Sequence, residues 1–221
     1  MNKKILVFDT ETSGLVKKDE PILSKQPYIV QYAHALIDVG NGHWDVEETW
    51  NKMFQIPINM PRRAQEVHGI SAERVKGKIY IYSVLDQILS RLEEADIIAG
   101  HNVRFDMNML FVEAKRIGQQ ERVKALAPKL VDTMKESKNI VGAKNKRGAL
   151  KNPNLQEAYK YFHGENFDGA HDALADVMAT AKVLKALYME NILSLTTPHD
   201  EGGSGEVEAD IKRPRKTEKG V

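Results

Sequence analysis

The sequence contains no cysteine, which excludes disulfide bonds, thiolate zinc sites and catalysis by a cysteine nucleophile. No apolar run reaches the length of a membrane span, and the first residues become charged too early for a signal peptide. We therefore expect no membrane association and a cytoplasmic location. A large charge of one sign is also missing, because 32 basic residues face 31 acidic ones for a net charge of +1. Any contact with nucleic acid must then come from local basic clusters.

Length and composition indicate one globular domain with a tail. The 221 residues suffice for a single hydrophobic core, and 42% hydrophobic with 29% charged residues is an ordinary balance. From about Thr196 the composition changes, and glycines and acidic residues precede a basic run over 212–216. We expect a folded domain over 1–195 and a disordered charged tail over 196–221. Such a tail is suited to tether the domain to a polymerase or another protein.

The first part of the chain reads as strands. Residues 5–8 are an apolar run that predicts a buried strand ending at Asp9. Residues 28–39 and 44–56 are longer strand-like runs, and the turn sequence Gly40-Asn41-Gly42 between them predicts an antiparallel hairpin.

Helical periodicity then alternates with short strands. Helices are expected from Ser83 to about Leu92, with Ser83 and Asp86 as a capping box, over 106–117 ending at Gly118, and over 172–188. Brief strands are expected at 96–99 and 130–134. This order predicts an α/β fold in which a mixed central sheet is flanked by helices.

Two carboxylates follow the first strand. Asp9 and Glu11 are two residues apart, so their side chains leave the same face of a strand. Adjacent carboxylates repel each other unless a cation lies between them, and Mg²⁺ or Mn²⁺ is the natural partner of oxygen ligands. The alternative is a strand end with two solvated acids, and this pair alone does not decide between the two.

Two further segments carry chemically useful side chains. Asp106 would open a helix, where a carboxylate is also an ordinary cap. His171 would lie at the entrance of the last helix, and Asp176 one turn further in, among small residues that suit close packing. A surface histidine and a solvated aspartate are the simpler alternatives for this last pair.

Taken together and in order, the motifs resemble the histidine-containing branch of the DEDD exonuclease superfamily. The matching segments are Phe8-Asp9-Thr10-Glu11-Thr12-Ser13-Gly14-Leu15, His101-Asn102-x-x-Phe105-Asp106 and His171-Asp172-Ala173-x-x-Asp176. His68-Gly69-Ile70 and Asp132-Thr133 are also similar to family segments. Ser13 stands where threonine is common, Gln31 stands where many relatives carry glutamate, and residues 134–153 fit poorly. The resemblance covers residues 4–187 and implies a ribonuclease H-like fold.

The resemblance also implies an activity and roles for individual residues. A metal-dependent 3′→5′ exonuclease would release nucleoside monophosphates from the 3′ end of nucleic acid, DNA in preference to RNA. Two Mg²⁺ or Mn²⁺ ions would be held by Asp9, Glu11, Asp106 and Asp176, with His171 as the general base. The terminal nucleotide would be bound by Thr12, Leu15, His68, Gly69, Asn102 and Phe105. The sequence leaves proofreading, repair, RNA trimming and a phage or defence role open.

Two other functions remain as alternatives. A ribonuclease-H-type endonuclease could share the fold, but such enzymes generally lack a histidine at the place of His171. An inactive binding module would be expected to have lost one of the acids or the histidine.

A basic stretch remains that the family pattern does not cover. Six basic residues lie within a short span that contains a single acid, Glu136, and several turn residues predict that the span is a loop. These basic residues are Lys135, Lys138, Lys144, Lys146, Arg147 and Lys151. The loop either aids solubility or holds substrate phosphates upstream of the scissile end.

Overall fold

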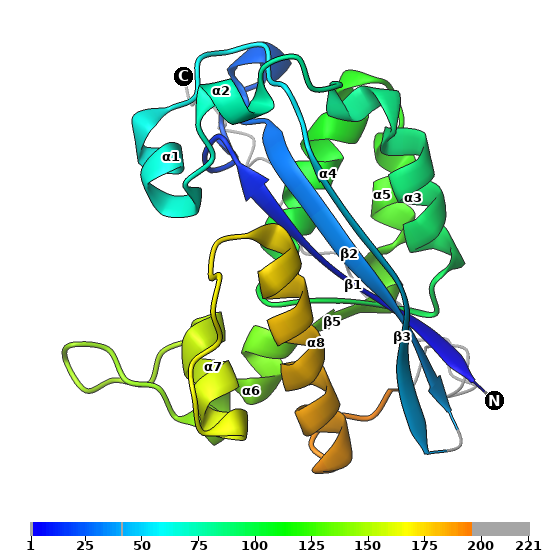
Figure 1. The fold of residues 1–221 in the computed structure, drawn as a ribbon, viewed down its shortest axis with the longest axis vertical. Coiled ribbons are helices and arrows are strands. Elements are labelled where there is room, and N and C mark those ends of the chain that lie inside the picture. Colours follow the sequence, from blue (N-terminus) through cyan, green and yellow to red (C-terminus); the bar gives the residue numbers. More distant parts are fainter. Residues whose placement is uncertain (1, 41, 196–221) are drawn as a thin grey trace, which may run out of the picture.

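The computed structural model describes residues 2–40 and 42–195. These residues contain a five-stranded sheet in the order β3-β2-β1-β4-β5 (Figure 1). The strands are β1 (Lys3–Thr12), β2 (Ile29–Gly40), β3 (His43–Met53), β4 (Ile97–Gly100) and β5 (Leu130–Asp132). The predicted charged tail lies outside the described residues.

The sheet is mixed, as the sequence predicts. Strand β2 is antiparallel to both of its neighbours, β1 and β3, whereas β4 is parallel to β1 and β5 is parallel to β4. The pair Gly40 and His43 closes the predicted hairpin between β2 and β3, and Asn41 lies outside the described residues. The parallel half places the carboxyl ends of β1, β4 and β5 at one edge, where ligand sites commonly form in α/β folds.

Helices cover both faces of the sheet (Figure 1). They are α1 (Arg62–His68), α2 (Ala72–Val75), α3 (Leu85–Glu94), α4 (Val103–Arg116), α5 (Gln120–Ala125), α6 (Thr133–Val141), α7 (Leu155–His163) and α8 (Ala173–Met189). Short 3₁₀ helices lie at Leu23–Lys25, Ile81–Ser83 and Ala127–Lys129. Throughout the described part of the chain, no helix combines the length and hydropathy that a bilayer span requires.

Alternation along β1 explains the two layers. Leu6 and Phe8 are buried against α3 and α4, whereas Ile5 and Val7 are buried against α8. Each such apolar side chain contributes about 1.5–3 kcal/mol when it is removed from water. The predicted apolar face of the last helix is confirmed, because Val177, Ala181, Leu184 and Leu187 are all buried.

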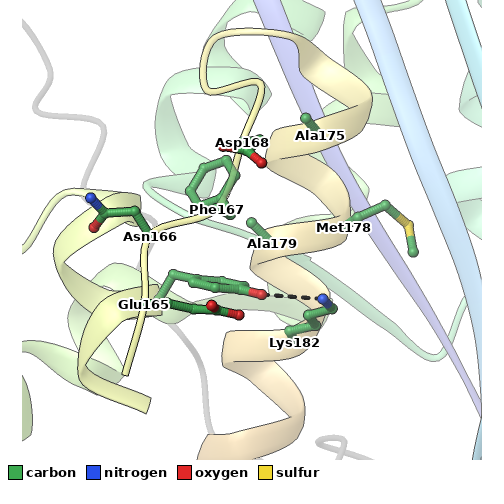
Figure 2. A pocket seen from close by; sticks show the side chains of 9 residues that line it. Glu165, Asn166, Phe167, Asp168, Ala175, Met178, Ala179 and Lys182 are labelled. Carbon is green, nitrogen blue, oxygen red and sulfur yellow. Dashed lines mark hydrogen bonds between the residues drawn. The ribbon is translucent and has the colours of Figure 1, made fainter. Parts of the chain in front are cut away.

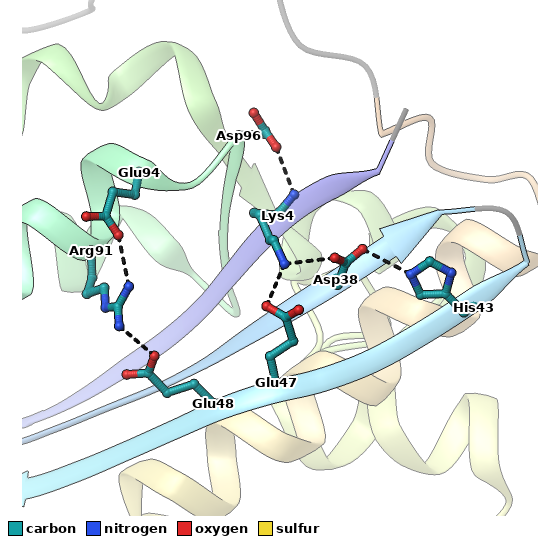
Figure 3. A network of polar contacts seen from close by, with 8 residues as sticks. All are labelled: Lys4, Asp38, His43, Glu47, Glu48, Arg91, Glu94 and Asp96. Carbon is teal, nitrogen blue, oxygen red and sulfur yellow. Dashed lines mark hydrogen bonds and ion pairs between the residues drawn. The ribbon is translucent and has the colours of Figure 1, made fainter.

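Ion pairs connect the strands at the end of the sheet where β1 begins and β2 turns into β3 (Figure 3). The amine of Lys4 on β1 donates to Asp38 on β2 and to Glu47 on β3. Asp38 also lies 3.0 Å from the ring of His43. These contacts hold the three antiparallel strands together at the end where the hairpin turns.

Two predicted helix starts were wrong. Helix α3 begins at Leu85 with Val84 as its N-cap and without a side-chain cap, so Ser83 and Asp86 form no capping box. Helix α4 begins at Val103, three residues before Asp106, because Asn102 adopts a left-handed conformation with φ of 70° that starts the helix earlier.

The stretch after β4 is more helical than predicted. Strand β5 ends at Asp132, which accepts a hydrogen bond from the backbone N–H of Met134 and so caps α6. Lys135 and Lys138 therefore lie on a helix, and the loop prediction was wrong for them. Helices α5 and α7 were also not predicted, although Asn154 and Glu157 form a capping box at the start of α7.

Candidate active site

Strand β1 brings two carboxylates to the carboxyl edge of the sheet. Asp9 and Glu11 occupy alternate positions of β1, which continues past the predicted end to Thr12. Side chains two residues apart share a face, and Ile5 and Val7 of the same series pack against α8. The two acids therefore lie on the face that α8 covers.

Asp106 reaches the same edge from the first turn of α4. Its Oδ1 accepts hydrogen bonds from the backbone N–H of Thr10 at 3.0 Å and from the Thr10 hydroxyl at 2.7 Å. The side chain is 2% exposed. A carboxylate in this position binds the strand instead of capping its own helix, so the simpler capping interpretation is wrong.

The start of α8 presents His171 and Asp176. Asp172 caps the helix, because its Oδ1 accepts from the N–H groups of Leu174 and Ala175 at 3.2 and 3.3 Å. His171 has a φ of 70°, in the left-handed region that residues other than glycine adopt only uncommonly. Its backbone N–H donates to Oδ2 of Asp176 at 3.1 Å. This turn fixes the histidine beside the acid while its ring stays exposed.

The three elements meet in one cluster. One ligand atom from each of Glu11, His171 and Asp176 lies within 4.8 Å of the other two. Oxygen and imidazole donors at such spacing can converge on a single divalent ion.

Electrostatics support the same conclusion. Burial raises the pKa of Asp9 well above its usual range, and the nearby acids, first Asp106, raise it further. Burial, together with the other acids, raises the pKa of Glu11 to about 8, and burial raises the pKa of Asp176 to about 6. Burial also raises the pKa of Asp106 to about 7, although hydrogen bonds from Thr10 lower it. A cation among these groups would reverse the shifts, so the donor set fits divalent metal ions.

Some predicted substrate-binding residues lie beside this cluster. His68 is 8% exposed at the end of α1, and its Nδ1 accepts from the N–H of Ile70 at 3.0 Å. Burial lowers the pKa of His68, and the proximity of His171 and Arg74 lowers it further. The backbone of Thr12 lies beside the same ring and opposes this shift. His68 thus lies close enough to His171 for the two rings to interact electrostatically, and the backbone of Thr12 lies beside His68.

The other predicted binding residues show no contact with the acids. Leu15 lies past the end of β1 and is 74% exposed. Gly69 ends α1 with a φ of 67°. Asn102 donates its backbone N–H to Asp132, and Phe105 packs against the core beneath α4. Their roles in substrate binding stay predictions.

Sequence reasoning missed supporting residues of the site. Thr10 holds Asp106, and alternation along β1 could have placed it on the opposite face from Asp9. Gln31 is 1% exposed and donates to Oδ2 of Asp172 at 3.0 Å, while its Oε1 accepts from Ala173 N–H at 3.4 Å. Gln31 thus ties the start of α8 to strand β2, a role that a local sequence pattern does not reveal.

The segment that leads to His171 crosses a cavity of about 340 Å³ on the outer side of α8 (Figure 2). Phe167 fixes this segment to α7, because Gln156 donates to its carbonyl at 2.7 Å and Tyr159 packs on its ring at 5.3 Å. Across the cavity, Lys182 of α8 donates to the Tyr159 hydroxyl at 3.1 Å. The short segment from Phe167 to His171 is therefore held at both ends, by α7 at Phe167 and by Asp176 at His171.

Comparison with known proteins agrees with this geometry. The RNase_T model, described as an exonuclease family, matches residues 6–184. The DNA polymerase III subunit epsilon of Rickettsia prowazekii is 27% identical over 188 residues, which cover 82% of this chain and 72% of the relative.

Two solved structures share the fold. Exonuclease I of E. coli in complex with a dT13 oligonucleotide has a TM-score of 0.66 and 20% identity over 84% of this chain. The chain spans 41% of that protein. The nuclease domain of 3′hExo, a DEDDh family member bound to rAMP, has a TM-score of 0.64 and 13% identity, covering 86% of this chain and 94% of that one.

The predicted ribonuclease H-like fold and the predicted DEDD 3′–5′ exonuclease superfamily are thereby confirmed. The chain belongs to the RNase T family of exonucleases.

Proposed function

We propose that this protein is a metal-dependent 3′→5′ exonuclease that releases nucleoside monophosphates from single-stranded or frayed 3′ ends of DNA. The observation that carries the proposal is the convergence of Glu11, His171 and Asp176 within 4.8 Å beside two further acids with raised pKa values. An inactive binding module has no need to hold five such groups together, because each buried carboxylate costs stability.

Four carboxylates would hold two Mg²⁺ or Mn²⁺ ions: those of Asp9, Glu11, Asp106 and Asp176. When bound, the ions would activate a water molecule and offset the negative charge that develops on the scissile phosphate. Thr10 keeps Asp106 in its rotamer through two hydrogen bonds. The protein thus supplies oxygen donors whose positions are set by β1, α4 and α8.

His171 is assigned the role of general base. Its backbone is fixed by the bond to Asp176 and by the capped start of α8, while its ring is exposed toward the solvent from which the nucleophilic water comes. An imidazole can accept a proton near neutral pH, which suits the removal of a proton from water.

The 3′-terminal nucleotide would bind beside this cluster. Thr12 and His68 are the best placed, since the ring of His68 interacts electrostatically with His171 and the backbone of Thr12 lies beside that ring. Leu15, with its exposed apolar side chain, can pack on the terminal base, and Gly69, Asn102 and Phe105 complete the proposed rim. A site that accepts only a chain end would give exonucleolytic cleavage.

The preference for DNA rests on the DNA polymerase III epsilon relatives. The same relatives support a polymerase as a protein partner, with the tail over 196–221 as the proposed tether. The cytoplasmic location expected from the sequence stays a prediction.

The proposal is tested with matched end-labelled substrates in Mg²⁺ or Mn²⁺. Linear single-stranded DNA should yield nucleoside monophosphates, and a chelator should stop the reaction. Circular single-stranded DNA should survive; its cleavage would identify an endonuclease. Faster degradation of matched RNA would overturn the preference for DNA.

A further inference from the structure

Residues 143–151 form a short β-hairpin, called the basic hairpin below, that projects from the domain between α6 and α7 (Figure 1). Lys151 donates its backbone N–H to the carbonyl of Ala143 at 2.8 Å, and Asn145 donates to Ala149 at 2.9 Å. The side-chain oxygen of Asn145 closes the turn by accepting two backbone N–H groups at 2.9 and 3.1 Å. The segment is therefore an ordered projection with a fixed turn.

Three cations of the basic hairpin are exposed and free. Lys144, Lys146 and Arg147 make no ion pair or side-chain hydrogen bond with any residue in the described ranges. The remaining cation, Lys151, is instead paired with Glu157 of α7 at 2.6 Å. Because the whole chain carries a net charge of only +1, this cluster is a local excess of positive charge.

The root of the basic hairpin is attached to the active-site edge of the sheet. The carbonyl of Pro153 lies 3.1 Å from Nε2 of His101, whose other ring nitrogen lies 3.0 Å from the hydroxyl of Thr133. His101 directly follows β4 and comes five residues before Asp106. The projection thus starts from the same edge that carries the catalytic acids.

An acidic cluster alone repels the polyanion on which it acts. Bound metal ions offset this repulsion at the scissile phosphate, whereas the phosphates of the remaining strand need cations further out. Lysine and arginine supply such contacts without reading the base sequence.

We propose that the basic hairpin binds the phosphates of a nucleic-acid strand on the 5′ side of the scissile bond, with Lys144, Lys146 and Arg147 as the contacts. This inference rests on the proposed function and adds a second substrate-binding site outside the metal cluster. It explains how a chain of nearly zero net charge holds a polyanion.

The test measures binding of fluorescent single-stranded DNA by anisotropy across a salt series, with Ca²⁺ in place of the active metal. Each phosphate contact to a single strand contributes about 0.7 to the slope of log affinity against log salt. Changing Lys144, Lys146 and Arg147 together to glutamine should therefore flatten the slope by roughly two units. An unchanged slope would overturn the proposal.

A matched control separates local contact from total charge. Lys115, Lys160 and Lys185 are also exposed and free within the described part, and they lie on α4, α7 and α8. The triple glutamine variant of these residues lowers the net charge equally and should keep the slope of the parent. If the slope flattened equally in both triple variants, the effect would come from total charge and not from a site on the hairpin. This result would also overturn the proposal.

A second readout distinguishes failure of the inference from failure of the proposed function. On a mononucleotide ester, which is too short to reach the basic hairpin, parent and hairpin variant should hydrolyse at equal rates. On a long single strand the KM of the variant should rise while its kcat stays the same. If the parent lacked all exonuclease activity, the proposed function would fail; if both proteins shared one KM, only the hairpin site would fail.

Discussion

The acidic side chains at the two ends of strands β1 and β2 have opposite environments. At the hairpin end, Asp38 is bonded to Lys4 and lies beside His43, and these partners lower the pKa of its carboxyl (Figure 3). At the other end, Asp9 and Glu11 lie among further acids, and their pKa values are raised. The acid at the hairpin end has protein cations as partners, whereas the acids at the other end are the ones that we propose bind cations from solution.

The largest expected effect comes from substituting an acid at the end of the sheet where, within the described residues, the acids have no protein cation as a partner, which we call the unpaired end. Asp9→Asn or Asp176→Asn should reduce exonuclease turnover below detection, because each removes a charged ligand of the proposed ions. The variants should stay folded, since the lost charge relieves repulsion. Turnover on labelled single-stranded DNA, with circular dichroism for the fold, checks this.

The matched change is Asp38→Asn at the paired end, which is the hairpin end where Asp38 contacts Lys4 and His43. This variant should keep the turnover of the parent. Near-normal turnover of the Asp9 variant in saturating Mn²⁺ would remove Asp9 from the metal site.

The next effect concerns the two histidines. His171→Ala should lower kcat by about 10²- to 10⁴-fold, the usual contribution of a general base. His43→Ala, at the paired end, should leave kcat unchanged. A His171 variant with the parent's rate would exclude this residue from the chemistry.

A smaller effect is expected in the pH dependence of stability without metal. Glu11 has a pKa of about 8 in the folded protein, above its unfolded value of about 4.5. Its neutral form thus stabilises the fold at low pH, and this contribution is lost as pH rises from about 4.5 through about 8. The full loss is on the order of a few kcal/mol.

Glu11→Gln lacks this titration, so the variant should become the more stable protein as pH rises through that window. Urea unfolding of both proteins at several pH values in a chelator measures the difference. Parallel stability curves for parent and variant would contradict the raised pKa of Glu11.

The smallest effect concerns the stability of the paired end. Asp38→Asn should lower Tm slightly, and the loss should shrink at high salt, because exposed ion pairs contribute little and are screened. Thermal melting in low and high salt checks this. If Tm fell as much as it does when a buried apolar side chain is truncated, the ion pairs of Asp38 would contribute more to stability than exposed ion pairs explain.

The sequence predicted the parts of the fold that depend on local patterns. The two strand-like runs on either side of the turn sequence Gly40-Asn41-Gly42 located the hairpin, and the four buried positions of α8 matched their helical spacing. Helix α6 escaped prediction because its sequence carries few apolar residues and its cap, Asp132, lies at a strand end.

The four acids proposed for the site can be picked out from the sequence, whereas the residues that support them cannot. Asp9, Glu11, Asp106 and Asp176 stand in recognisable order along the chain. The bond of Thr10 to Asp106 joins residues 96 positions apart, and that of Gln31 to Asp172 joins residues 141 apart. Such contacts arise from tertiary packing, so no local pattern specifies them.

The central claim is that the unpaired acids form a metal site. It is tested most directly by isothermal titration of Mn²⁺ into the parent, and into Asp9→Asn, in the presence of a deoxynucleoside monophosphate. We expect two bound ions per chain in the parent and the loss of at least one in the variant. A parent that binds no Mn²⁺, or a variant that binds it as the parent does, would contradict the assignment.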